Sequence, residues 1–247
     1  MAPDAVDVNL VIDAAGCDAA SQSQARLHGN GISSGWVTAA ASRTEDPEKH
    51  DELLARACER SPSLHPVPVL IPPTAVPGAY ERARRLAATA RCRVVRLCPS
   101  GHGYPLADWV LSPLPELCER EGVALVLDFA PEALRWSETV AFARAYPALP
   151  MVVLDAEIGI DRALPAALDA APNLLLHVAQ LPSPEHLVRL ADVYGTSRFV
   201  WGSGPPGAGA ARESIAAAEG LGEEGRAAIL HDNAQALQDG GYAERFL

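Results

Sequence analysis

Four ionisable side chains stand at or near the ends of short apolar runs: Arg96, Asp128, Asp155 and His177. Carboxylates and an imidazole can exchange protons with a substrate, and a guanidinium can hold an anionic group. We therefore expect Asp128 or Asp155 to act as a general base, His177 to shuttle a proton and Arg96 to bind an anionic part of the substrate. The same four groups could instead neutralise one another as a buried ion-pair network.

Two further candidates follow Arg96 in a glycine-containing segment. His102 and Tyr104 are predicted to overhang the site and contact a ligand, although a mobile surface loop is the alternative interpretation. Cys17 could be a nucleophile or a ligand if its thiol ionises. No histidine lies near it in the sequence, which favours a buried, inert thiol.

The elements that must position these groups alternate along the chain. Short β-branched or apolar runs are each followed by a stretch with helical spacing, which is the pattern of a parallel sheet covered by helices. The predicted strands are Val8–Asp13, Gly35–Ala41, His65–Ile71, Arg93–Cys98, Val123–Phe129, Met151–Ala156, Asn173–Val178 and Arg198–Ser203.

Turn and cap signals divide these units. Asp46-Pro47 is expected to open a helix that runs to Arg60, and Ser112-Pro113 and Ser183-Pro184 each place a hydroxyl before a proline at the first helical position. Gly122 and Gly195 are expected to end the latter two helices. A last helix, Glu223–Leu237, is predicted to pack on the barrel.

Eight such units in 247 residues predict an α/β fold, a single (β/α)8 TIM barrel over residues 1–247. An open doubly wound sheet is the alternative, but the turn after the first run lacks the glycine-rich dinucleotide fingerprint. In a barrel, alternate strand residues point inward and the active site lies at the carboxyl ends of the strands. This spacing predicts that Arg96, Asp128 and His177 point inward. It also places Asp155 on the same face of its strand as Val153, so that its carboxylate is expected to point inward too.

Composition narrows the classes of function. The net charge of -11 argues against nucleic acid as a partner, and no apolar run is long enough to cross a membrane. The acidic start of the chain lacks the features of a signal peptide, so a cytoplasmic protein is expected. The 5 cysteines include no C-x-x-C pair, which favours reduced thiols. A small-molecule ligand is expected, no cofactor is predicted, and a homo- or hetero-oligomer remains open.

Three segments resemble the amidohydrolase-related, metal-dependent barrel hydrolases. They are Val11-Ile12-Asp13, the segment Arg198–Pro206 and the segment Ala228–Ala234. The resemblance covers nearly the whole chain and implies a TIM barrel with hydrolase-like chemistry. It also implies a metal site built from a His-x-His after strand one, histidines ending strands five and six, and an aspartate in the turn after strand eight.

This sequence departs from that metal pattern. The corresponding positions hold Ala15, Cys17 and Gly204, and carboxylates at Asp128, Asp155 and Glu157 stand where the resemblance implies imidazoles. Alanine and glycine have no donor atom, so the usual zinc site is predicted to be absent, and the protein as purified is predicted to hold no stoichiometric zinc. An oxygen-rich site for Mg²⁺ or Mn²⁺ remains an alternative.

Three hypotheses about function follow. The chain is a divergent enzyme of hydrolase, decarboxylase or lyase type that acts on a small, possibly carboxylated molecule. Alternatively, it is a catalytically silent pseudoenzyme that binds a ligand or partners an active homologous subunit, or it is a metallohydrolase with unusual ligands. The first hypothesis expects Arg96 to point toward a ligand and one of the two aspartates to have a raised pKa.

Overall fold

The computed structural model describes residues 4–13, 19–89, 93–128, 136–156, 162–179, 183–203 and 210–246. Cys17 and the positions Ala15, Glu157 and Gly204 lie outside these ranges, so the expectations made for them remain expectations.

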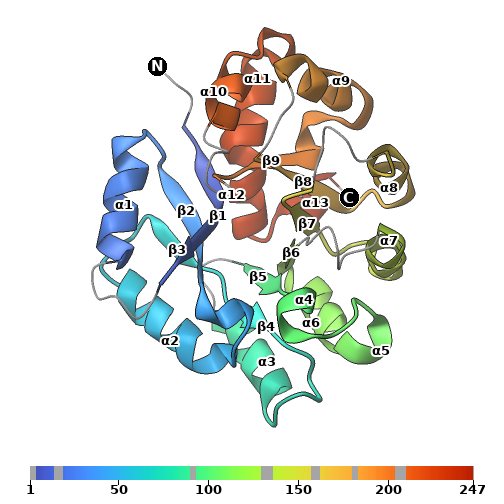
Figure 1. Ribbon diagram of the computed structural model, residues 1–247. Coiled ribbons are helices and arrows are strands. Elements are labelled where there is room, and N and C mark those ends of the chain that lie inside the picture. The colour runs from blue at the N-terminus through green and yellow to red at the C-terminus, as the bar shows by residue number, and fades with distance from the viewer. Residues whose placement is uncertain are drawn as a thin grey trace.

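Parallel strands form the centre of the molecule, and helices surround them (Figure 1). One sheet has the order β1-β2-β3 and the other the order β4-β5-β6-β7-β8-β9. The strands are β1 (Val6–Ile12), β2 (Ser34–Ala39), β3 (Leu64–Pro66), β4 (Val69–Leu70), β5 (Val94–Leu97), β6 (Ala124–Asp128), β7 (Met151–Leu154), β8 (Leu174–Val178) and β9 (Phe199–Trp201). This is the predicted (β/α)8 barrel.

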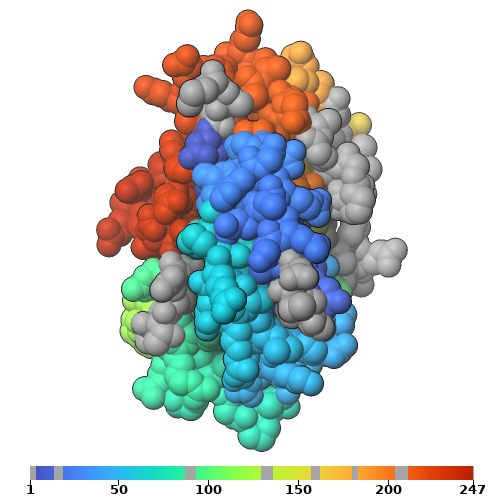
Figure 2. All heavy atoms as spheres, turned by 90° about the vertical axis from the view of Figure 1, so that its left-hand side faces the viewer, coloured from blue at the N-terminus to red at the C-terminus, as the bar shows by residue number. Residues whose placement is uncertain are grey.

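The helices follow the strands in turn. They are α1 (Ala19–Gly29), α2 (Pro47–Cys58), α3 (Ala79–Thr89), α4 (Pro99–His102), α5 (Asp108–Leu111), α6 (Leu114–Glu121), α7 (Trp136–Ala145), α8 (Leu164–Ala170), α9 (Pro184–Tyr194), α10 (Ala210–Ala216), α11 (Gly222–Ala227), α12 (Asn233–Gln238) and α13 (Tyr242–Phe246). Short 3₁₀ turns occupy Ala41–Arg43, Thr196–Arg198 and Glu219–Leu221. Figure 2 shows the side of the barrel that α1 and α2 cover. Within the described part of the chain, none of the helices combines the length and apolar character needed to cross a bilayer.

The predicted third strand, His65–Ile71, is divided in two. β3 pairs with β2 and β4 pairs with β5, so the two sheets meet at this point. Pro66 and Pro68 explain the break, because proline has no N–H to donate to a neighbouring strand. On the outside of this break an open groove of about 720 Å³ lies against α2, β3 and α3.

Contacts between β1 and β9 close the barrel. The backbone N–H of Ser203 donates to the Asp7 Oδ1 atom at 2.9 Å, which joins the end of the last strand to the first. Gly202 allows this approach, because a Cβ there would lie 3.1 Å from the Asn9 backbone nitrogen. The barrel interior is apolar below the mouth. One buried cluster combines residues of seven strands with Val67, which lies between β3 and β4: Val6, Val8, Trp36, Val67, Val94, Val126, Val152, Leu175 and Val200.

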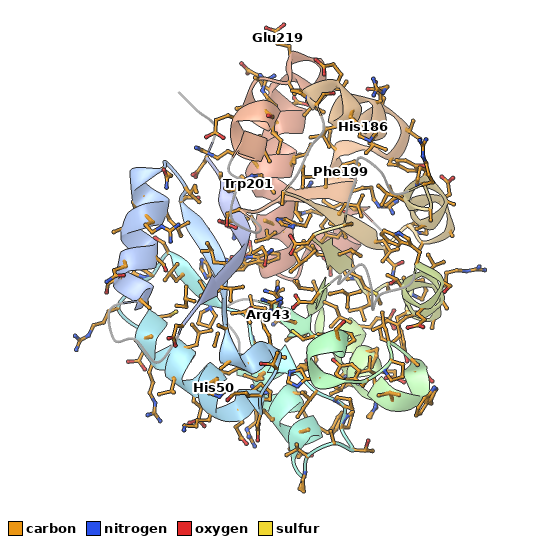
Figure 3. All side chains as sticks on the ribbon, in the orientation of Figure 1. Arg43, His50, His186, Phe199, Trp201 and Glu219 are labelled. Atoms are coloured by element: carbon orange, nitrogen blue, oxygen red, sulfur yellow. The ribbon has the colours of Figure 1, made fainter. Side chains whose placement is uncertain are left out.

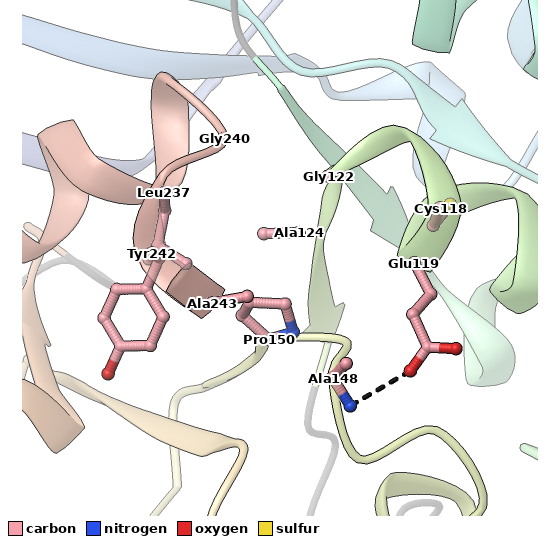
Figure 4. Close-up of a pocket in the computed structure, with 10 residues that line it drawn as sticks. All are labelled: Cys118, Glu119, Gly122, Ala124, Ala148, Pro150, Leu237, Gly240, Tyr242 and Ala243. Carbon is pink, nitrogen blue, oxygen red and sulfur yellow. Dashed lines mark hydrogen bonds between the residues drawn. The ribbon is translucent and has the colours of Figure 1, made fainter. Parts of the chain in front are cut away.

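The C-terminal segment closes the opposite end of the barrel. The predicted helix Glu223–Leu237 is present as α11, a π-helical segment Ala228–Asp232 and α12. Asn233 secures it, since its side-chain amide donates to the carbonyls of Thr196 and Phe199, both at 2.9 Å. A small cavity of about 30 Å³ remains beside this segment, where Glu119 accepts a hydrogen bond from the Ala148 backbone (Figure 4). That volume suits about one water molecule rather than a substrate.

The predicted caps are present only in part: Pro184 begins α9 and Gly195 follows its end as expected, but the Ser183 side chain makes no capping hydrogen bond. Asp46 caps α2 by accepting from the Glu48 N–H at 3.1 Å, and α2 ends at Cys58, two residues before the predicted end. Gly122 ends α6 in a left-handed conformation with φ 65°. The prediction for Ser112-Pro113 is wrong in detail: Pro113 is the residue before the helix, and the Ser112 hydroxyl donates to Glu116 instead.

Candidate functional site

Arg96 lies at the centre of the polar cluster in the barrel mouth. It belongs to β5, and its side chain is 3% exposed. Its Nε donates to the Asp128 Oδ1 atom at 2.5 Å, and a terminal nitrogen contacts the same oxygen. That terminal nitrogen, Nη2, also donates to the Asn9 Oδ1 atom at 3.2 Å, and Nη1 donates to the Thr38 hydroxyl at 3.4 Å. The guanidinium is therefore surrounded by oxygen acceptors from β1, β2 and β6.

A second guanidinium, that of Arg43, shares the Asp128 carboxylate. The Arg43 Nε donates to Asp128 Oδ2 at 2.9 Å, and the Arg43 side chain is 41% exposed. Figure 3 shows it near the middle of the ring of strands. Burial acts to lower the pKa of Arg43, but the charge and hydrogen bond of Asp128 raise it, so the group stays charged. Its two terminal amino groups form no hydrogen bond with the described residues.

The turn that bears Arg43 is held from two sides. The ring nitrogen Nε2 of His102 lies 3.0 Å from the Ser42 carbonyl oxygen, and the Ser42 hydroxyl donates to Asp51 at 2.6 Å. Gly101 packs directly against the turn, because a Cβ at this position would lie 1.9 Å from the Arg43 carbonyl oxygen. Asp51 also forms an ion pair with Arg82. These contacts fix the backbone from which the Arg43 side chain extends.

Asp155 and His177 form a second pair in the mouth. The His177 Nδ1 atom lies 3.3 Å from Asp155 Oδ1, and Asn9 Nδ2 lies 3.4 Å from Asp155 Oδ2. Burial acts to raise the pKa of Asp155, but the hydrogen bond and charge of His177 and the charge of Arg96 outweigh it and lower the pKa. Asp155 is thus ionised at neutral pH, and its side chain is 36% exposed.

The orientation of Asp155 differs from the predicted one. Val153 belongs to the cluster between strands and helices, whereas Val152 and Leu154 face the barrel interior, so alternation alone would turn residue 155 outward. Asp155 follows the last residue of β7 and has a left-handed backbone with φ 55°, which is uncommon for a residue with a Cβ. This backbone turn brings its carboxylate to Asn9 and His177. Such strain is typical of functional sites.

His177 is fully buried, with its ring between Asp155 and β9. Its Nδ1 also lies 3.3 Å from the Asp155 backbone nitrogen, whereas Nε2 is buried with no hydrogen-bond partner among the described residues. A Cβ at Gly202 would lie 2.6 Å from Nε2, so only glycine leaves room for this ring. Nearby Asp7 is also buried, and its pKa is raised by desolvation despite two backbone hydrogen bonds.

The structure brings four predicted site residues into one linked set. Arg96 contacts Asp128, and Asn9 joins Arg96 to Asp155, which contacts His177. One expectation is nevertheless wrong, because Arg96 points at Asp128 rather than toward the open mouth. The raised pKa expected for one of the two aspartates is not that of Asp155, whose pKa is lowered.

His102 and Tyr104 do not form a loose loop. His102 ends α4 and contacts the Ser42 backbone, so it supports the Arg43 turn. Tyr104 packs against the core, and its hydroxyl is buried with no hydrogen-bond partner among the described residues. Burial raises the pKa of Tyr104 beyond its usual range. The Cys98 thiol donates to Asp128 at 3.3 Å, and burial raises its pKa as well.

Sequence reasoning missed Asn9, Thr38 and Arg43. The first two are polar residues inside otherwise apolar strands, and this is a signal that could have identified them. Arg43 gives no such signal, because it lies in the turn after β2 and reaches the site only through the path of that turn.

The described residues by themselves supply no complete set of metal ligands. No group of three or more histidine, cysteine, aspartate or glutamate side chains converges within the described ranges. Asp128 is already shared by two guanidinium groups, and Asn9 Oδ1 accepts from Arg96. A divalent ion about 4 Å from the Arg96 charge would be repelled by about 8 kcal/mol at an effective dielectric constant of about 20. The prediction about Ala15, Cys17 and Gly204 concerns residues outside these ranges and stays a prediction.

A barrel of parallel strands with a polar cluster at their carboxyl ends is the architecture of a TIM-barrel enzyme family. The family model described as "Amidohydrolase" matches residues 11–237 of the chain. The protein therefore belongs to the amidohydrolase family, as the resemblance in its sequence indicated. A search of curated protein sequences found no match.

Solved structures support the same fold. The 5-carboxyvanillate decarboxylase of Sphingomonas paucimobilis matches with a TM-score of 0.72 and 13% identity, over 96% of this chain and 99% of that one. An uncharacterised TIM-barrel protein of Bordetella bronchiseptica matches with a TM-score of 0.72 and 16% identity, over 98% of this chain and 100% of that one. A dihydroxybenzoic acid decarboxylase of Polaromonas sp., solved with manganese and 2-nitroresorcinol, matches with a TM-score of 0.66 and 14% identity, over 96% of each chain.

Proposed function

We propose that this protein is a decarboxylase-type enzyme that acts on a small carboxylated molecule at the barrel mouth. The observation that carries the proposal is the exposure pattern of the charged cluster. Arg96 and His177 are buried, whereas Arg43 is 41% and Asp155 36% exposed. A cation with free donors and an ionised carboxylate are therefore open to the mouth. Arg43 thus takes the anion-binding role that the sequence had suggested for Arg96.

Each exposed group has a distinct task in this proposal. The terminal amino groups of Arg43 hold the substrate carboxylate through charge-assisted hydrogen bonds. On decarboxylation the bond between that carboxylate and the adjacent carbon breaks, CO₂ leaves, and the electron pair stays on the carbon. The proton that replaces CO₂ passes through Asp155, which is open to solvent and contacts His177. Asn9 and the left-handed backbone keep the Asp155 carboxylate in place.

The structural neighbours support this choice among the hydrolase, decarboxylase and lyase types. Two of them are decarboxylases of small aromatic acids, and they align with nearly the whole chain. Their sequence identity is 13% and 14%, so they indicate a substrate class to test rather than a substrate.

The test is a decarboxylation assay with 5-carboxyvanillate and with 2,6-dihydroxybenzoate, the compound named for a decarboxylase of Rhizobium that is a further structural neighbour, followed by ultraviolet absorbance and CO₂ release. Asp155→Asn should lower kcat by at least about 100-fold, as expected for loss of a proton-transfer group. Arg43→Gln should mainly raise KM. The matched controls are Asp192→Asn and Arg84→Gln, which alter exposed residues of the same types and should leave both constants unchanged. Turnover that survives Asp155→Asn would refute the assigned role.

A silent, ligand-binding barrel is the second candidate, and one observation favours it. Arg96, Asp128, Asp155 and His177 contact one another directly or through Asn9, which is the self-neutralising arrangement of an ion-pair network. Under this alternative, calorimetry would detect binding of 2,6-dihydroxybenzoate that Arg43→Gln weakens, while no CO₂ is released by the wild-type protein. CO₂ release by the wild type would exclude it.

A further inference from the structure

The Arg96 guanidinium has the surroundings of a bound cation. Its hydrogen-bond acceptors are a carboxylate, an amide oxygen and a hydroxyl, supplied by Asp128, Asn9 and Thr38 from three different strands. Oxygen atoms of these types are also the ligands that Mg²⁺ and Mn²⁺ prefer. The side chain is almost completely buried, so its charge is fixed in position.

The Arg96 charge lies beside two of the strands that the family resemblance assigns to a metal, and it reaches the end of one of them at Asp128. Asn9 belongs to β1, the first barrel strand, and Asp128 to β6, which is the fifth because β3 and β4 together form the third. Asp155 follows β7, the sixth. Asp155 is also influenced by Arg96, because the Arg96 charge contributes to its lowered pKa. Arg96 itself comes from β5, the fourth barrel strand, and its side chain contacts Asn9 within β1 and Asp128 at the end of β6.

We propose that the Arg96 guanidinium replaces a divalent metal ion in this barrel, and that the two cations exclude each other. Arg96 already binds the Asp128 carboxylate, which is one of the oxygen donors that a metal would need. Arg43 adds a second positive charge on the same carboxylate, and the ionised Asp155 nearby supplies a second negative charge, so two cations face two carboxylates without a metal. A guanidinium remains charged at all physiological pH values, but it offers no open coordination position to a water molecule.

This inference does not rest on the proposed decarboxylase function. A silent barrel would hold the same guanidinium, and so the metal-binding result and the decarboxylation result can fail independently.

The test is Mn²⁺ binding measured by electron paramagnetic resonance on metal-stripped protein. The wild-type protein should bind no stoichiometric Mn²⁺ at this site. Arg96→Gln, which removes the charge but retains much of the side-chain volume, should bind one Mn²⁺ per chain at least about tenfold more tightly than the wild type. Arg96→Gln with Asp128→Asn should lose this binding, because the carboxylate is gone. Arg84→Gln, an exposed arginine paired with Glu81, is the matched control and should behave as the wild type.

Two outcomes would overturn the inference. One is tight, stoichiometric Mn²⁺ binding by the wild-type protein, a measurement that needs no variant to fold. The other is an Arg96→Gln protein with a wild-type circular dichroism spectrum and no gain in Mn²⁺ binding. If Arg96→Gln does not fold alone, refolding in the presence of Mn²⁺ should restore the native spectrum, and failure to do so also counts against the inference.

Discussion

Asp128→Asn provides a sharp test of the charge network, because it removes one charge and leaves the shape of the side chain unchanged. Asp128 forms an ion pair with both Arg96 and Arg43, and its side chain is 13% exposed. Removal of one partner from a buried pair costs about 3–5 kcal/mol, since the other charge stays buried without compensation. The exposure of Arg43 places the expected loss near the lower limit, at about 3 kcal/mol.

The loss should be visible in thermal unfolding. For 247 residues the unfolding entropy is about 0.5 kcal/mol/K. A loss of about 3 kcal/mol therefore lowers Tm by about 6 °C. Differential scanning calorimetry at pH 7 measures this shift, with urea unfolding as an independent measure. The exposed Asp192→Asn control should change stability by less than about 0.5 kcal/mol. A Tm for Asp128→Asn within about 1 °C of the wild type would refute the view that this carboxylate holds the two cations in place.

Three further predictions concern pH, packing and thiol reactivity. Because the folded pKa of Asp155 is lowered, its contribution to stability is present above the unfolded value of about 3.9 and is lost as pH falls through the folded value. Urea unfolding should thus show a gap between the wild type and Asp155→Asn at pH 7 that closes in acid, and a pH-independent gap would contradict this. Gly202→Ala should lower Tm by several degrees through its clash with His177, whereas Gly29→Ala, with open space around it, should not. Ellman's reagent at pH 8 should leave the thiols of Cys58, Cys98 and Cys118 unmodified in the native protein, because they are buried and their pKa values are raised. Labelling of all five cysteines without unfolding would be inconsistent with this burial.

The sequence was most informative where local physics decides the structure. Alternation of apolar runs and helical stretches predicted the barrel, because each strand and helix must bury an apolar face. It also correctly predicted that the side chains of Arg96, Asp128 and His177 point inward, because each residue lies within a strand, where side chains alternate with a period of two.

The sequence was least informative at strand ends and turns. Asp155 lies one residue past β7, where a left-handed backbone replaces alternation, so its direction depends on contacts with Asn9 and His177. The split of the third strand could have been inferred from Pro66 and Pro68, which lack the donors a continuous strand needs.

The family and the barrel were thus determined by the sequence itself, through periodic burial and three short segments of resemblance. Only the tertiary structure decided which cation faces the mouth. Arg96 and Arg43 are 53 positions apart in the sequence, and neither a strand nor a helix pattern predicts that both contact Asp128. Their meeting depends on the turn after β2, which His102 and Asp51 hold in place. Contacts between residues distant in sequence set that geometry, and no local pattern encodes them.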